Sequence, residues 1–365
     1  LTTAPHDRLD SMDALRGLAV VLAAPWITLL ALAQPPGVSD PLDLNAIPLA
    51  EAVIYLLGHL CPAIFMLLAG AAVQLDAARH DRSRLHQMYR LGGRIVLLLA
   101  IEMTIVSMLL NEALVASHVE LTLLWIIPAG YLVLLGAVWL PPALSTVAGA
   151  TLIGLLPLVP ATPPHGMDAL ASAWTLLFQP GTILVPDLWF DIRVTTPAAG
   201  WIGIMLLGYG LAPLIAEDHG TARNRRLVML GLGLLGAFLA LRLGGLYGGR
   251  EPMSWSPDTV ATVLSALNTG RFPPSLHHLL MVLAPLPLLL ALYDTRYGRV
   301  TRGLALLGRG SLPAFLVVLM GAFGARIYFA GAPLTTAWDV GVAGAALLAL
   351  GLAAAAPQAV PRSPR

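Results

Sequence analysis

Long apolar segments alternate with short polar connections along the chain. Each apolar segment runs for roughly 20 residues, the length that an α-helix needs to cross the hydrocarbon core of a bilayer. Pro and Gly occur inside several segments, which membrane helices tolerate because neighbouring groups satisfy the freed backbone atoms. The pattern predicts ten transmembrane helices, at 13–33, 49–75, 94–112, 119–139, 142–160, 197–216, 226–246, 274–293, 309–330 and 337–356.

These helices predict an all-α fold, a polytopic membrane helix bundle with about ten transmembrane helices. One membrane domain occupies residues 1–356, and a short polar tail follows at 357–365. The composition agrees with this prediction, because 57% of the 365 residues are hydrophobic and only 11% are charged. Soluble domains usually contain about 25% charged residues.

The basic residues are unevenly distributed among the connections. All 21 of them are Arg. If the N-terminus lies in the cytoplasm, most of them fall in cytoplasmic segments, including a cluster at 79–94. Such an excess of positive charge is typical of cytoplasmic loops, so we expect both termini in the cytoplasm. The net charge of +1 gives no indication of a nucleic-acid partner.

The first helix begins with a charged pair. Asp13 and Arg16 are three residues apart, and positions with this spacing are neighbours on one helical face. The pair either anchors the helix at the cytoplasmic interface or braces the cytoplasmic end of the bundle.

Six stretches of the chain form a collinear set of motifs. They are MDALRGLAVVL (12–22), GHLCPAIFMLLAG (58–70), LWIIPAGYLVLLGAVWLP (124–141), GWIGIMLLGYGLAPL (200–214), LNTGRFPPSLHHLLMVLAPLPLLLAL (267–292) and LLGRGSLPAFL (306–316). Together they resemble the heparan-alpha-glucosaminide N-acetyltransferase-like family of membrane proteins. Bacterial members, mostly uncharacterised integral membrane proteins, resemble the chain most.

The resemblance implies a reaction, its partners and a location. An acyltransferase of this family would move an acetyl group from cytoplasmic acetyl-CoA to a sugar amine or hydroxyl across the membrane. A His buried in the bundle would carry the acyl group or activate its transfer. The partners would be membrane lipids, acetyl-CoA and a carbohydrate acceptor, and the location a bacterial inner membrane.

Two ionisable residues lie well inside predicted helices, where a charged side chain costs roughly 2.5–3.5 kcal/mol. His59 corresponds to the His of the family's second-helix motif, and an imidazole there could exchange a proton or attack an acyl donor. Glu102 could orient His59 as its acidic partner. The structural alternatives are a His bonded to a neighbouring carbonyl and a protonated Glu that donates an interhelical hydrogen bond.

Polar residues also gather at the outer ends of the predicted helices. Two prolines begin the eighth helix, and a helix N-terminus beside an Arg attracts anions. We therefore expect an acceptor site at the outer mouth. Its candidate substrate-binding residues are Arg242, Asn268, Arg271, His277 and, in the long outer loop, His165. The alternatives are a polar interfacial cap, which we favour for His278, and an ion pair of Arg242 with Glu102 or Glu251.

The donor would bind on the cytoplasmic side. The Arg cluster at 79–94 could hold the phosphates of CoA, because guanidinium groups match phosphate oxygens. Topology control and contact with anionic lipid are the alternatives. Asp13 and Arg16 would then belong to the donor side. We expect no metal, because the Cys and His residues lack the spacing of a metal site.

Two positions depart from the family pattern. Bacterial relatives have an Asp-His pair where this chain has Trp26 and Ile27, and a late His where it has Val318. These apolar replacements favour an alternative function, a non-catalytic membrane carrier or binding protein on the same scaffold. The sequence leaves open whether the protein is an enzyme, which acceptor it uses and whether it forms a homo-oligomer.

Overall fold

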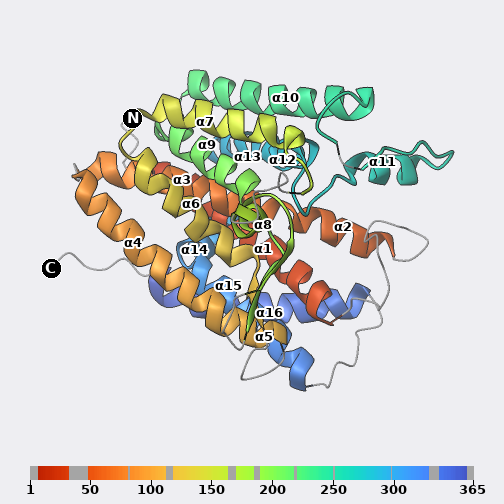
Figure 1. Cartoon of the computed structure of the whole chain (residues 1–365). Coiled ribbons are helices and arrows are strands. Elements are labelled where there is room, and N and C mark those ends of the chain that lie inside the picture. Colours follow the sequence, from red (N-terminus) through yellow and green to blue (C-terminus); the bar gives the residue numbers. More distant parts are fainter. Residues whose placement is uncertain are drawn as a thin grey trace.

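The structure is a computed structural model, and it describes residues 7–32, 48–80, 83–111, 118–162, 170–184, 190–217, 220–249, 251–296, 298–328 and 337–359. Helices make up most of it (Figure 1). The α-helices are α1 (Asp7–Leu32), α2 (Leu49–Gly58), α3 (Leu60–His80), α4 (Arg84–Ile101), α5 (Ser107–Asn111), α6 (Leu123–Ala137), α7 (Pro142–Leu155), α8 (Ala171–Leu177), α9 (Ala199–Ala216), α10 (Thr221–Gly244), α11 (Thr259–Leu267), α12 (Leu276–Leu283), α13 (Pro285–Thr295), α14 (Arg299–Arg309), α15 (Ser311–Tyr328) and α16 (Ala337–Ala359). A π-helical turn, η1 (Glu102–Val106), joins α4 to α5, and a 3-10 turn, η2 (Leu156–Leu158), follows α7.

Seven helical segments of the described chain are long and apolar enough to cross a membrane. They are Asp10–Leu32, Leu49–Arg79, Arg84–Asn111, Ala199–Ala216, Thr221–Gly244, Leu276–Thr295 and Ser311–Tyr328. Three shorter apolar helices, Leu123–Ala137, Pro142–Leu158 and Val342–Ala353, lie within further predicted ranges or overlap them. The structure thus confirms the predicted polytopic helix bundle, whereas the count of ten crossings stays a prediction.

A small sheet replaces the start of one predicted helix. The prediction of a helix from residue 119 was wrong, because β1 (His118–Leu121) pairs in parallel with β3 (Asp191–Val194). Strand β2 (Gly181–Ile183) pairs with β3 in antiparallel fashion, which gives the order β1-β3-β2. Glu120 and Arg193 are directly opposite in the register, and their side chains form an ion pair of 3.1 Å. This cross-strand pair helps to hold the segment as a strand.

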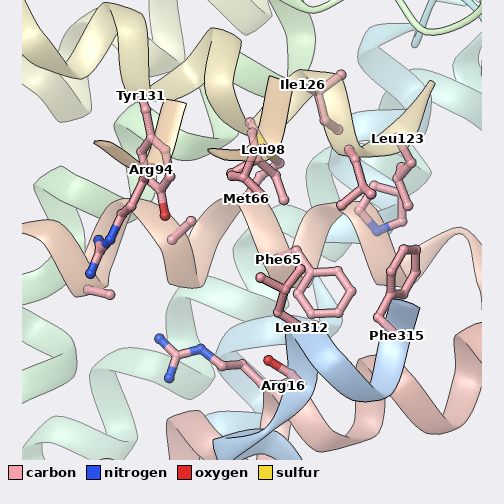
Figure 2. A pocket seen from close by; sticks show the side chains of 16 residues that line it. Arg16, Phe65, Met66, Arg94, Leu98, Leu123, Ile126, Tyr131, Leu312 and Phe315 are labelled. Atoms are coloured by element: carbon pink, nitrogen blue, oxygen red, sulfur yellow. The ribbon is translucent and has the colours of Figure 1, made fainter. Parts of the chain in front are cut away.

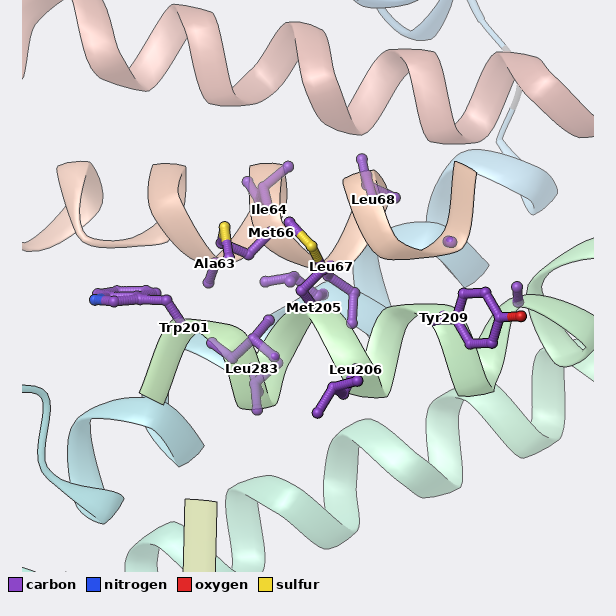
Figure 3. Packing of buried hydrophobic residues seen from close by; sticks show 14 of the residues in the cluster. Ala63, Ile64, Met66, Leu67, Leu68, Trp201, Met205, Leu206, Tyr209 and Leu283 are labelled. Atoms are coloured by element: carbon purple, nitrogen blue, oxygen red, sulfur yellow. The ribbon is translucent and has the colours of Figure 1, made fainter. Parts of the chain in front are cut away.

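The core lies where α3 packs along α9 (Figure 3). Figure 3 shows Met66 and Leu67 of α3 against Met205 of α9, whereas Leu206 points away from α3. Glycine allows the two backbones to approach closely, since a Cβ atom on Gly208 would lie 2.0 Å from the carbonyl oxygen of Leu67. Small residues at such crossings are typical of helix packing in membranes, where dispersion contacts replace the hydrophobic effect.

The second predicted helix is interrupted at a candidate site residue. Helix α2 ends at Gly58, and α3 begins at Leu60, so that His59 lies between them. Pro62 explains the interruption, because it has no N–H to donate to the carbonyl four residues earlier. The His59 N–H bonds instead to the carbonyl of Leu56, at 3.2 Å. The break therefore places an imidazole where the backbone is irregular.

We predict that Gly208→Ala destabilises the bundle. The added methyl group would collide with the Leu67 carbonyl oxygen, and overpacking of this kind typically costs about 1–3 kcal/mol. The apparent unfolding temperature of the purified protein in detergent should fall. Gly233→Ala on α10 is the matched control, because its Cβ would have no atom within 4 Å and Ala favours a helix over Gly. Equal unfolding temperatures for the two variants would contradict the close approach of α3 and α9.

Candidate active site

Two buried histidines face each other inside the bundle. The ring centroids of His59 and His278 are 5.1 Å apart, with the rings close to perpendicular. Their exposed fractions are 3% and 0%. His278 lies in the first turn of α12, where Ser275 caps the helix by accepting the His278 N–H at 3.1 Å. A helix break and a helix start thus bring the two imidazoles together.

Several polar atoms around the two rings are buried and have no hydrogen-bond partner. They are both ring nitrogens of His59, Nε2 of His278, and the indole nitrogens of Trp26 and Trp201. The rings of Trp201 and His278 are 6.1 Å apart. A buried polar atom without a partner costs about 1–3 kcal/mol, so that a concentration of such atoms calls for an explanation. A site built to bind and transform a polar ligand provides one.

Arg271, from the segment before α12, lies among the same residues. We call the set of Trp26, Tyr55, His59, Trp201, Arg271 and His278 the central group. Its guanidinium carbon lies 4.6 Å from the ring of Trp26, 5.1 Å from that of Tyr55 and 4.5 Å from that of Phe272. Burial lowers the pKa of Arg271 from its ordinary value, and contact with Tyr55 opposes that shift. Within the described chain no carboxylate forms an ion pair with Arg271, whose guanidinium instead contacts aromatic faces and hydrogen-bonds to Tyr55.

The same group brings together residues that lie far apart in the sequence. Tyr55 also contacts His59, with ring centroids 4.7 Å apart. Thr269 Oγ1 lies 3.1 Å from Nδ1 of His278. The structure thus brings two of the predicted site residues, His59 and Arg271, close together. The sequence favoured a polar interfacial cap for His278, whose side chain is instead fully buried, and Thr269 was missed.

Glu102 does not take part in this group. Its Oε1 accepts hydrogen bonds from the Thr122 N–H and, at 2.9 Å, from the Thr122 hydroxyl. In the described structure the side chains that contact His59 include Tyr55 and His278 but not Glu102. The predicted pairing of Glu102 with His59 was therefore wrong. Glu102 instead fixes the junction between β1 and α6, where Thr122 precedes the first helical residue.

Arg242 has a structural environment. Its guanidinium donates to the backbone carbonyls of Ala266, Glu251, Ser265 and Asn268, at distances of 2.5–3.0 Å. These bonds tie the end of α10 to α11 and the segment before it. The predicted ion pair of Arg242 with a Glu side chain was wrong, because the bond to residue 251 goes to its backbone. Arg242 thus supports the segment between α10 and α11, and its predicted contact with a substrate stays a prediction.

The remaining outer candidates lie beside the group. The ring of His277 contacts the carbonyl of Tyr247 through Nε2, at 2.9 Å. The backbone carbonyl of Asn268 is one of those held by Arg242. His165 falls within 163–169, outside the described residues. Of the four predicted substrate-binding residues that the structure describes, Arg271 is the one whose guanidinium lies over the Trp26 and Tyr55 rings.

The apolar replacements share one buried cluster. Trp26, Ile27 and Val318 all belong to it, together with Cys61 and Phe315. The Trp26 indole also fills the space next to Gly58, where a Cβ atom would lie 2.3 Å from its ring. Trp26 thus takes part in core packing like Ile27 and Val318, and it also contacts Arg271.

A cavity of about 240 Å³ extends from a charged end to an apolar end. Figure 2 shows the guanidinium groups of Arg16 and Arg94 at one end, and Leu123 and Phe315 at the other. Arg94 also forms a hydrogen bond to the hydroxyl of Tyr131. Two cations at the end of an otherwise apolar chamber suit a ligand with an anionic head and a less polar arm.

The cavity follows one face of α3. Pro62, Met66, Ala69 and Ala72 all line it, and these positions share a helical face. The distance along α3 from Pro62 to Ala72 is about 15 Å, at 1.5 Å per residue. His59 precedes Pro62 by three residues and does not itself line the cavity. The helix break at His59 thus lies about one turn before the first residue of α3 that lines the cavity.

An ionic network surrounds the charged end. Arg16 donates to Asp13 at 2.7 Å. Arg309, the last residue of α14, donates to Asp10 at 2.9 Å and lies 3.8 Å from Asp13. Asp13 thus contacts two guanidiniums, one of which also lines the cavity. The predicted bracing role of the Asp13–Arg16 pair agrees with this geometry, since the network joins α1 to α14.

A family model described as heparan-alpha-glucosaminide N-acetyltransferase, catalytic, matches residues 8–239. No curated protein matches the chain. The matched range includes Trp26, His59 and most of the cavity lining, whereas Arg271 and His278 lie beyond it. The match covers more than half of the 365 residues. The chain therefore belongs to the heparan-alpha-glucosaminide N-acetyltransferase family.

Proposed function

We propose that this membrane protein transfers an acetyl group from acetyl-CoA to a sugar amine or hydroxyl on the opposite side of the membrane. One observation carries the proposal. His59, with both ring nitrogens unpartnered, lies three residues before Pro62, which lines a cavity that also has Arg16 and Arg94 in its wall. A thioester donor has this arrangement of parts, with phosphates at one end and the reactive carbonyl at the other.

The charged end of the cavity fits the phosphates of CoA. Guanidinium groups form paired, charge-assisted hydrogen bonds with phosphate oxygens. The Arg-rich connections support a cytoplasmic location for this end, where acetyl-CoA would enter. The apolar lining along α3 suits the pantetheine arm, which would reach toward the break at His59.

His59 would receive the acetyl group. A neutral imidazole nitrogen attacks the thioester carbon, the C–S bond breaks, and the thiolate of CoA leaves with the electron pair. The positive charge of Arg271 lies beside the two histidines, and a cation in a water-poor site stabilises the oxyanion that forms during attack. The acceptor would approach from the outer mouth near Arg271 and remove the acetyl group from His59.

We predict that His59→Ala abolishes acetyl transfer. Loss of the nucleophile should slow transfer from radiolabelled acetyl-CoA to glucosamine by about 10²-fold or more. It should also remove any label that wild-type protein retains without acceptor. His86→Ala is the control, because His86 is exposed on α4. Wild-type protein that binds CoA but neither retains nor transfers label would support the carrier function instead, which the buried Ile27 and Val318 favour.

We predict that Arg94→Ala weakens CoA binding. A hydrogen bond to a charged group contributes about 1.5–3 kcal/mol, so that the dissociation constant should rise about 10- to 100-fold. The CoA-dependent increase in unfolding temperature reports this change, since a ligand that binds only the folded state stabilises it. Arg226→Ala removes an Arg that pairs with Glu217 away from the cavity. Equal CoA-dependent shifts in the two variants would rule out the cavity as the phosphate site.

A further inference from the structure

We propose that His278 accepts the proton of the acceptor while His59 carries the acetyl group, so that the two histidines divide the reaction between them. The proposal rests on the proposed function and adds a catalytic residue to it. His278 lies outside the range that the family model matches. Glu102, the predicted acidic partner of His59, is hydrogen-bonded to Thr122 instead.

The geometry leaves both rings available to a reacting group. The centroids are 5.1 Å apart, yet no hydrogen bond joins the rings, because both His59 nitrogens and Nε2 of His278 are without partners. Arg271 lies close to both histidines, with its guanidinium over the Trp26 and Tyr55 rings. An acceptor that attacks an acetyl group on His59 would therefore have a second imidazole nitrogen within reach.

Thr269 would set the role of each nitrogen of His278. A neutral imidazole carries one N–H and one lone pair, and the hydrogen bond to one nitrogen decides which is which. The Thr269 hydroxyl lies 3.1 Å from Nδ1 and is 4% exposed. If Nδ1–H donates to Thr269 Oγ1, the lone pair lies on Nε2, the nitrogen without a partner. The backbone bond from the His278 N–H to Ser275 holds the residue in place.

The step balances as follows. The amine or hydroxyl of the acceptor attacks the acetyl carbon, the bond between that carbon and His59 breaks, and its electron pair returns to the imidazole. The proton lost by the acceptor passes to Nε2 of His278, which then delivers it to the CoA thiolate. The sum is acetyl-CoA plus acceptor, giving acetylated acceptor plus CoA thiol.

The test separates formation of the acetyl-enzyme from its discharge. Purified full-length protein is incubated with radiolabelled acetyl-CoA without acceptor, and glucosamine is then added. We expect wild type to take up label and release it to glucosamine, His59→Ala to take up none, and His278→Gln to take up label but release it about 10²-fold more slowly, the lower limit of general-base catalysis. His86→Gln should behave like wild type.

The Thr269 variants check the assignment of the nitrogens. Thr269→Val removes the hydrogen-bond acceptor of Nδ1 and should slow release about 10-fold, whereas Thr269→Ser keeps the hydroxyl and should restore it. Because a buried His can be needed for folding, each variant must also retain the CoA-dependent rise in unfolding temperature. If His278→Gln loses that rise, the comparison of the Val and Ser variants decides the proposal.

The outcomes distinguish the two proposals. Release from His278→Gln at the wild-type rate, or equal release from Thr269→Val and Thr269→Ser, overturns the role of His278 and leaves the acetyltransferase intact. Loss of label uptake in a folded His278→Gln also overturns it, because His278 would then act in acetylation of the enzyme. Absence of uptake and transfer in wild type overturns the proposed function itself, and the role of His278 with it.

Discussion

Polar groups inside this bundle need partners, because hydrocarbon offers none. The chain meets that requirement in several places with groups of the backbone. Arg242 bonds to four carbonyls, and Glu102 accepts two hydrogen bonds from Thr122. Buried Arg223 pairs with Asp294 and donates to the carbonyls at the end of α9. Each of these side chains fixes an element boundary through its hydrogen bonds, although Oε2 of Glu102 has no partner.

The histidine pair differs because several unpartnered polar atoms gather in one place. Other buried polar atoms of the described chain also lack partners, for example the hydroxyls of Ser11 and Ser145 and one carboxylate oxygen each of Glu102 and Glu120. Each of those is a single atom of its side chain. Around Arg271, by contrast, both nitrogens of His59, Nε2 of His278 and the indole nitrogen of Trp26 lack partners together. This concentration distinguishes the histidine pair from the rest of the described interior.

The sequence predicted the bundle well because long apolar runs determine where helices lie, whatever their neighbours. It also located His59, through a motif, and Arg271, through its place before a helix. It could not identify the neighbours of Glu102, because helical periodicity gives the face of a residue but not the helix opposite it. The strand at 118–121 depends on pairing with a segment about 70 residues later. Long-range contacts of this kind leave no local pattern.

The two histidines lie at helix boundaries, where the backbone departs from regular helical hydrogen bonding. His59 lies at the break between α2 and α3, and His278 in the first turn of α12 after a proline pair. Membrane proteins tolerate such interruptions only where the backbone is buried in protein or lines a cavity. A straight helix through residue 59 would need an N–H at position 62, which Pro62 lacks. The proline that ends the regular hydrogen bonding also lines the cavity, so one residue links the helix break next to the His59 imidazole to the cavity wall.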